Sequence, residues 1–192
     1  MESRKFTPDR MARLDRPERL KEYDIPGIIS GIGISEGMAV ADIGAGTGFF
    51  SIPFSEAAGS KGRVLAVDLS VEMLEALGAK AKVLGLTNIK TVLSTEEAIP
   101  IPDGSVDIAF MSNVFHELEG DGTMREIARI LKPGGRLAIL DWKKVYEENG
   151  PPYRHRISAP DVISRCQEVG FVFVGEFKTG SNSHYGLLFR KM

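Results

Sequence analysis

The chain has 192 residues, enough for one substantial α/β domain with a full hydrophobic core. Its 24 Lys and Arg against 26 Asp and Glu leave a net charge of −2, too weak a field to gather nucleic acid or an anionic membrane. We therefore expect a small-molecule partner. The single cysteine, Cys166, excludes an internal disulfide and a thiolate metal cluster, so we expect it to fill the core and expect no metal site.

The amino-terminal 20 residues mix charges of both signs and lack the apolar stretch of a signal peptide. No run in the chain approaches the roughly 18 apolar residues of a membrane-spanning helix. These features predict a cytoplasmic protein. One or two helices packed on the edge of the domain are expected within residues 1–35, where apolar side chains recur at helical intervals: Leu20, Ile25, Ile28, Ile29 and Ile32.

From Met38 onward, predicted strands and helices alternate. Strands are expected at residues 38–44, 63–69, 88–94, 105–112 and 136–142. Helices are expected at 49–58, 70–85, 123–132 and 158–170, with Ser70 and Ser158 as N-caps. The last two strands, 171–179 and 185–191, lie a short turn apart and should pair antiparallel. The order predicts an α/β fold over residues 36–192, a mostly parallel, Rossmann-like sheet with helices on both faces.

A glycine-rich loop, ADIGAGTG at residues 41–48, follows the first predicted strand. Such loops let backbone N–H groups approach a ligand beyond the carboxyl ends of the strands. The dinucleotide fingerprint is G-x-G-x-x-G, but Gly44, Gly46 and Gly48 follow G-x-G-x-G, which weakens a pyrophosphate ligand. Asp42 at the mouth of the loop suits a ligand that carries an ammonium group.

A second acid, Asp68, ends the second predicted strand, 20 residues beyond Gly48. An acid at this place accepts hydrogen bonds from both hydroxyls of a ribose and repels a 2′-phosphate. It could alternatively cap the following helix, although Ser70 already supplies a cap. The favoured ligand is a nucleoside joined to an amino-acid-like group.

The sequence resembles the class I S-adenosylmethionine-dependent methyltransferases, the small type similar to ubiquinone/menaquinone-biosynthesis methyltransferases. The resemblance covers residues 36–192 and rests on four ordered stretches: VADIGAGTGFFS, VLAVDLSVEML, IPIPDGSVDIAFMSNVFHEL and EIARILKPGGRLAILDWK. It implies a seven-stranded sheet whose last strand inserts antiparallel. It also implies S-adenosyl-L-methionine as cofactor and S-adenosyl-L-homocysteine as product.

The resemblance assigns residues to the cofactor. Gly44 and Gly46 would offer backbone to the methionine part, Asp68 would hold the ribose, and Leu69 would lie against the adenine. The rest of the implied cofactor set is Asp42, Ala45, Gly48, Met73, Thr95, Glu96, Asn113 and Val114. Thr95 stands where this type commonly has an acid. Glu96, the next residue, is therefore the alternative partner for the adenine amino group. Glu96 and Glu97 could instead be a pair of solvated loop charges.

Methyl transfer from a sulfonium needs alignment first, and a general base only where the acceptor must lose a proton. His116, after the fourth strand, and His155, on the long connection after the fifth, are candidate bases; each could instead be structural. His184, at the start of the final strand, is expected to be structural. Tyr153, Arg154 and Arg156 could line the same rim and meet an acidic substrate, or belong to a solvated loop.

The amino-terminal segment, residues 1–35, commonly closes over the cofactor in proteins of this type. Tyr23, Ile25 and Ile28 could therefore form part of a lid, or simply pack at the edge of the sheet. With so short a lid, the acceptor is expected to be a small molecule. GPPY at residues 150–153 resembles a motif of DNA adenine methyltransferases, but it follows the fifth strand rather than the fourth, and no basic surface accompanies it.

Three functions follow from these features. The leading one is methyl transfer from S-adenosylmethionine to a small molecule, with carbon, nitrogen and oxygen all open as the accepting atom. A non-catalytic, cofactor-binding regulator or partner subunit would have the same motifs. An NAD-dependent dehydrogenase is disfavoured by the glycine spacing. The oligomeric state stays open, a homo-oligomer included.

Overall fold

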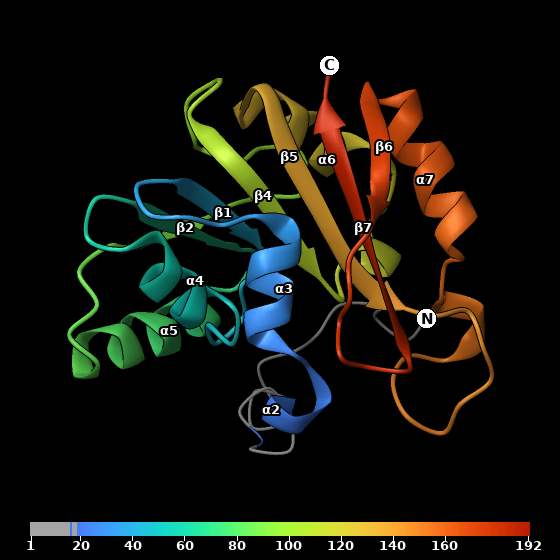
Figure 1. The fold of residues 1–192 in the computed structure, drawn as a ribbon, viewed down its shortest axis with the longest axis horizontal. Coiled ribbons are helices and arrows are strands. Elements are labelled where there is room, and N and C mark those ends of the chain that lie inside the picture. The colour runs from blue at the N-terminus through green and yellow to red at the C-terminus, as the bar shows by residue number, and fades with distance from the viewer. Residues whose placement is uncertain (1–15, 17–18) are drawn as a thin grey trace.

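In the computed structural model, residue 16 and residues 19–192 are described, and their strands form one sheet in the order β3-β2-β1-β4-β5-β7-β6 (Figure 1). The strands are β1 Ala39–Ile43, β2 Arg63–Asp68, β3 Ile89–Leu93, β4 Val106–Ser112, β5 Leu131–Trp142, β6 Phe171–Glu176 and β7 His184–Lys191. β1 to β5 pair in parallel, and β7 is antiparallel to both β5 and β6. The predicted seven-stranded, mostly parallel sheet is confirmed.

Helices cover both faces of this sheet, as predicted (Figure 1). The helices are α2 Arg19–Glu22, α3 Ile25–Ile32, α4 Ser51–Ala58, α5 Val71–Val83, α6 Gly122–Ile130 and α7 Ala159–Glu168, with short 3-10 helices η2 Phe115–Glu117 and η3 Tyr153–His155. Ser70 and Ser158 cap α5 and α7 through their hydroxyls, which confirms both predicted caps. No helix in the described part of the chain is both long and apolar enough to cross a membrane.

The core consists of two main layers, because side chains alternate between the faces of each strand. Val40, Ile108 and Phe110 pack with α3 and α4 on one face, while Ala109 and Met111 pack with α6 and α7 on the other. Cys166 of α7 is fully buried in the second layer, and burial raises the pKa of its thiol to about 12. The prediction of a core-filling cysteine is confirmed.

Predicted boundaries are clearly wrong at two places in the chain. The helix expected at 123–132 ends at Ile130, and the strand expected at 136–142 begins at Leu131, because Leu131 pairs with Val106 ahead of an irregularity in the β4–β5 ladder. The strand expected at 171–179 ends at Glu176, so residues 177–183 form a longer connection than the short predicted turn. Tertiary pairing decides both boundaries, which local sequence does not reveal.

Residues 1–15 and 17–18 of the predicted lid lie outside the described residues. In the described remainder, the backbone N–H of Asp24 donates to the carbonyl of Thr179 and ties the start of α3 to the β6–β7 connection. Ile28 is fully buried against the sheet, whereas Tyr23 borders the cavity described below. The apolar positions of α3 therefore pack on one face of the sheet, over its central strands, rather than at its edge as expected, and Tyr23 faces the site.

Candidate active site

A cavity of about 970 Å³ opens at the carboxyl ends of β1, β2 and β4, where ligands of open α/β sheets bind. Among the described residues, its lining includes every residue predicted to hold the cofactor or to act as a base, except Gly48, and it includes none of the predicted rim residues Tyr153, Arg154 and Arg156. The predicted residues that it brings together are Asp42, Gly44, Ala45, Gly46, Asp68, Leu69, Met73, Thr95, Glu96, Asn113, Val114, His116 and His155. These residues therefore share one cavity, and their roles toward a ligand stay predictions.

The amides at the start of the glycine loop are engaged within the protein. The amides of Gly44 and Ala45 both donate to the carbonyl of Val67, and that of Gly46 donates to Asp68 Oδ2 over 2.8 Å. A loop with these donors engaged is a poor cradle for phosphates. The backbone contact that Gly44 and Gly46 are expected to make with the methionine part of the cofactor stays a prediction.

Gly44 and Gly48 serve different purposes. At Gly44, where φ is +73°, a Cβ atom would lie 2.3 Å from Val114 Cγ2, so the missing side chain lets the loop approach the end of β4. Gly48 is not part of the cavity lining described above. A Cβ there would lie 2.9 Å from the Leu77 side chain, so Gly48 allows the loop to pack on α5.

We expect Gly48→Ala to destabilise the protein by about 1–3 kcal/mol without changing its affinity for S-adenosylhomocysteine, because φ is +92° and the new Cβ meets Leu77. Calorimetry and isothermal titration measure the two quantities. Gly78→Ala on α5 is the matched control, because a Cβ there meets open space. Replacing this helical glycine should raise the free energy of unfolding by about 0.5–1 kcal/mol. A large loss of affinity in Gly48→Ala would place Gly48 in the ligand site after all.

Asp42, at the end of β1, is a buried acid on the cavity wall; its side chain Oδ2 accepts a 2.6 Å hydrogen bond from the hydroxyl of Ser51, the first residue of α4. Burial, with a smaller contribution from the charge of Asp68, raises the pKa of Asp42 to about 7 against the lowering effect of Ser51. A buried carboxylate without a cation is costly. The site is therefore complementary to a positively charged group.

Asp68, at the end of β2, uses both carboxylate oxygens. Oδ2 accepts from the Gly46 amide and Oδ1 accepts from the Ser70 amide over 3.0 Å. A carboxylate has about four lone-pair positions, so one acceptor position remains on each oxygen. Two adjacent hydroxyls, such as those of a ribose, match this arrangement. Since the Ser70 hydroxyl caps α5, Asp68 is not needed as the cap.

The far end of the cavity is formed by the residues that the resemblance assigns to the adenine. Leu69 is 45% exposed and Met73 is buried, so together they offer an apolar surface. Thr95 and Glu96 lie beside them, and the Glu96 carbonyl accepts from the Thr123 hydroxyl over 2.8 Å. Glu96 is half-buried, unlike the exposed Glu97, which disfavours the alternative of a solvated pair.

Two residues at the end of β4 that line the cavity have polar atoms without hydrogen-bond partners among the described residues. Asn113 adopts φ of +58°, and its Nδ2 donates to the Tyr23 hydroxyl over 3.1 Å. Asn113 Oδ1 and Ser112 Oγ are buried and lack hydrogen-bond partners among the described residues. Buried polar atoms are nearly always paired in folded proteins. These two atoms on a cavity wall therefore indicate contact with a ligand.

His116 lies in η2, directly after β4, and forms a buried pair with Asp141 of β5. Its Nδ1 is 2.8 Å from Asp141 Oδ1, and its backbone amide donates to Oδ2. Burial opposes the charged imidazole, but the hydrogen bond and charge of Asp141 outweigh burial, so the pKa of His116 is raised. Because Nδ1 carries the proton that faces Asp141, Nε2 is the basic nitrogen of the neutral ring.

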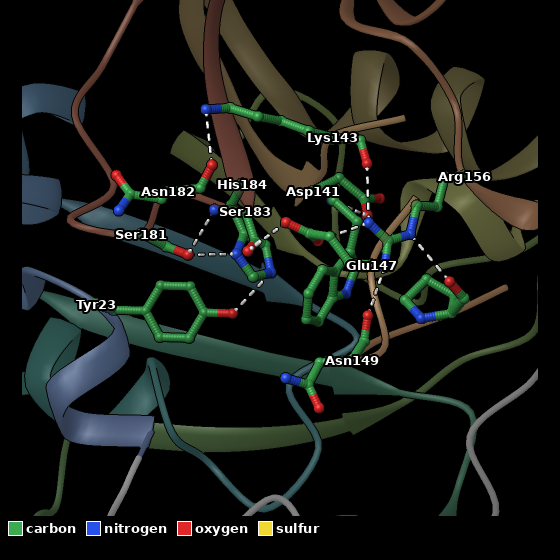
Figure 2. Close-up of polar contacts among 12 residues, drawn as sticks. Tyr23, Asp141, Lys143, Glu147, Asn149, Arg156, Ser181, Asn182, Ser183 and His184 are labelled. Atoms are coloured by element: carbon green, nitrogen blue, oxygen red, sulfur yellow. Dashed lines mark hydrogen bonds and ion pairs between the residues drawn. The ribbon is translucent and has the colours of Figure 1, made fainter. Parts of the chain in front are cut away.

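The other two histidines differ from His116. His155 ends η3 and lines the cavity half-buried. His184 is buried; its ring packs against Trp142 at a centroid distance of 4.0 Å, and its Nε2 lies 3.1 Å from the Tyr23 hydroxyl (Figure 2). Burial lowers the pKa of His184 to about 4, so it stays neutral. This arrangement fits the structural role expected of His184.

Sequence reasoning missed Asp141, Trp142 and the true place of Arg156. Asp141 had a usable signal, since it ends an apolar run just as Asp42 and Asp68 do. Arg156 contradicts both expectations for it: its side chain is neither on a rim nor solvated but fully buried, and it contacts the segment before it (Figure 2). Trp142 lines the cavity beside it.

A parallel sheet whose first two strands end in acids that open into one cavity defines a protein that binds a nucleoside cofactor. Residues 41–139, just over half of the chain, match the methyltransferase domain family. The ubiquinone/menaquinone biosynthesis C-methyltransferase UbiE of Pasteurella multocida (strain Pm70) is 35% identical over 114 residues, 58% of this chain and 42% of that protein. The chain thus aligns with about half the length of such curated relatives.

Solved structures extend the match to the whole chain. A SAM dependent methyltransferase from Aquifex aeolicus has a TM-score of 0.93 and 35% identity, covering 98% of this chain and 100% of that one. Geranyl diphosphate C-methyltransferase from Streptomyces coelicolor A3(2), solved with S-adenosyl-L-homocysteine, shares the fold alone at 14% identity, with a TM-score of 0.76 over 97% of this chain and 86% of that one. The chain belongs to the methyltransferase domain family, among the class I enzymes whose cofactor is S-adenosylmethionine.

Proposed function

We propose that this protein transfers a methyl group from S-adenosylmethionine to a small-molecule acceptor. The observation that carries the proposal is the buried carboxylate of Asp42, which shares one cavity with Asp68 and needs a cation. Asp42 would hold the ammonium group of the cofactor and Asp68 the two ribose hydroxyls. Leu69 and Met73 would enclose the adenine, with Thr95 and Glu96 at its edge.

For methyl transfer, the main contribution of the protein is to align the acceptor atom with the methyl group. When bound, S-adenosylmethionine supplies a methyl group on a positively charged sulfur that is already a good leaving group. The acceptor atom would form its bond to the methyl carbon while the carbon–sulfur bond breaks and its electron pair stays on sulfur. Holding the two reactants in line contributes up to about 7–11 kcal/mol, and Val114 and Asn113 at the end of β4 would form the floor on which they align.

His116 would accept the proton that the acceptor loses. Asp141 holds the imidazole through Nδ1 and would stabilise the positive ring that forms, as the acid does in other His–Asp pairs. The relatives bear the name C-methyltransferase. We therefore propose an acceptor carbon on a ring that carries an ionisable hydroxyl, since removal of that proton makes the ring carbon nucleophilic. After the carbon–carbon bond forms, the hydrogen on that carbon moves as a proton to the ring oxygen, so one proton is released in total.

Two measurements test this function. Isothermal titration should show binding of S-adenosylhomocysteine and none of NAD; the reverse result would sink the proposal. Incubation with isotopically methyl-labelled S-adenosylmethionine and a cell metabolite extract, followed by mass spectrometry, should then reveal a labelled small molecule. Cofactor binding without any labelled product would indicate a regulatory or partner subunit in place of an enzyme.

The Asp68→Ala variant is expected to bind S-adenosylhomocysteine more weakly by about 1.5–3 kcal/mol, the usual worth of hydrogen bonds to a charged group. Isothermal titration gives the change directly. Glu97→Ala is the matched control, because Glu97 is an exposed acid that is absent from the described lining. Equal affinities for the two variants would remove Asp68 from the ribose site.

A further inference from the structure

Residues 143–155, the first part of the connection between β5 and α7, border the cavity with Asn149, Gly150, Pro151, Pro152 and His155. We call these five residues the acceptor wall. The sheet order places β5 beyond β4, on the opposite side from β1 and β2. The acceptor wall therefore lies at the end of the cavity away from Asp68, where the acceptor rather than the nucleoside would bind if the proposed function holds.

Apart from the three-residue η3, this segment contains no helix or strand, yet it is not left to solvent. Arg156, the residue that follows it, has a side chain that is 0% exposed. Figure 2 shows this side chain pointing back toward the segment. Its Nε donates to the Pro151 carbonyl over 2.9 Å, its Nη1 to the Lys143 carbonyl over 3.1 Å, and its Nη2 to the Asn149 carbonyl. The guanidinium thus replaces the backbone pairing that a strand or helix would supply.

Two further contacts fix the orientation of this guanidinium. Nη1 lies 2.8 Å from Glu147 Oε2, so the buried charge is paired within the same segment. The guanidinium carbon lies 5.1 Å from the centroid of the Trp142 ring, and Trp142 itself lines the cavity. At Gly150 a Cβ would lie 2.8 Å from the same ring, so the wall packs directly on Trp142.

The segment is also joined to the β6–β7 connection. Glu147 Oε1 accepts from the Ser183 hydroxyl over 2.9 Å, and the Lys143 amide donates to the Ser183 carbonyl over 2.8 Å (Figure 2). The same connection holds Asp24, the neighbour of Tyr23, through Thr179. Arg156 is therefore the buried centre of a contact set that links residues 143–151 to the β6–β7 connection, which in turn holds Asp24.

We propose that Arg156 is a positioning residue that holds the acceptor wall against Trp142 and so sets the shape of the acceptor site. Its planar fork of donors reaches carbonyls at positions 143, 149 and 151 together, which a lysine ammonium on a single atom does not match. That the wall faces a methyl acceptor rests on the proposed function. That Arg156 holds residues 143–155 in place does not depend on that function.

The test uses Arg156→Met and Arg156→Lys in the full chain, with Arg190→Met, an exposed arginine on β7, as control. Trp142 is the single tryptophan of the chain, so the fluorescence comes from one ring, which the acceptor wall and Arg156 both contact. With S-adenosylhomocysteine bound, acrylamide should quench Trp142 more strongly in Arg156→Met, and its emission should shift to longer wavelength. Arg156→Lys should give a smaller change in the same direction, and Arg190→Met none.

Kinetics with the acceptor found by the labelling experiment separate positioning from folding. The KM for the acceptor should rise about 10-fold or more in Arg156→Met, while the affinity for S-adenosylhomocysteine is unchanged. If calorimetry shows that Arg156→Met does not fold, Arg156→Lys, which keeps the charge beside Glu147, decides the question. Unchanged quenching, or a loss confined to cofactor affinity, overturns the proposal. Absence of methyl transfer by the unaltered protein overturns the proposed function, and the quenching then still decides whether Arg156 holds the segment.

Discussion

The Asp42→Asn variant is expected to lose about two to four orders of magnitude in affinity for S-adenosylhomocysteine, while the cofactor-free protein becomes more stable above pH 7. Removing one partner of a buried ion pair costs about 3–5 kcal/mol, because the other charge stays buried without compensation. Here the remaining charge would be the ammonium group of the ligand. The amide keeps the size of the side chain and its contact with Ser51, so the cavity keeps its shape.

The gain in stability follows from the sign of the pKa shift. The pKa of Asp42 is raised from its ordinary 3.8 to about 7, so the folded chain holds this proton more tightly than the unfolded chain does. Stability from this group is fully present below about pH 4 and is lost as the pH rises through 7. At about 1.4 kcal/mol for each pKa unit, the loss has a ceiling of about 4 kcal/mol. The uncharged amide in Asp42→Asn does not titrate, so the variant avoids this loss of stability.

Calorimetry at pH 5 and pH 8, with titration of S-adenosylhomocysteine at both, checks these expectations. The unaltered protein should bind the ligand more weakly at pH 5, since Asp42 must release its proton first, and Asp42→Asn should lack this pH dependence. Asp103→Asn is the matched control, because the Asp103 side chain is 80% exposed and its ion pair with Arg129 lies at the surface. Tight binding by Asp42→Asn would show that the ligand ammonium lies elsewhere.

Local sequence revealed those parts of the site that sit on regular elements. Asp42 and Asp68 each end an apolar run, and the carboxyl ends of neighbouring parallel strands meet at one edge of the sheet, so their meeting in one cavity was predictable. Asp141 follows the same rule on β5. Its role depends on contact with His116, which is 25 residues away and requires the β4–β5 pairing to be known.

The features that sequence did not reveal are those set by non-local packing. Gly48 matches a ligand-binding pattern, yet Leu77 on α5 decides its purpose. The amides of the glycine loop turn to Val67 and Asp68 on the neighbouring strand, which no motif records. Arg156 lies in a segment rich in proline and charge, where an arginine is usually exposed. Its burial follows from carbonyls that the same segment leaves without strand or helix partners.

The His116→Gln variant is expected to reduce kcat by about 10²–10⁴-fold, the usual contribution of a positioned base, with cofactor affinity unchanged. Glutamine keeps a polar side chain beside Asp141 but does not accept the proton at neutral pH. The measurement is kcat at saturating S-adenosylmethionine, with the acceptor found by the labelling experiment. His155→Gln is the matched comparison, because His155 also lines the cavity. A loss confined to His155→Gln would make His155 the base.

The pH dependence of kcat gives an independent check. Since the pKa of His116 is raised above its ordinary 6.5, the neutral ring that accepts a proton is lost as the pH falls through that raised pKa. The kcat of the unaltered protein should therefore decrease toward acidic pH. The residual kcat of His116→Gln should not show this decrease. Bound cofactor would hold Asp42 ionised, so the titration of Asp42 should change cofactor affinity but not kcat. The decrease of kcat toward acidic pH should therefore report the titration of His116. A decrease that persists unchanged in His116→Gln would assign the proton to another group.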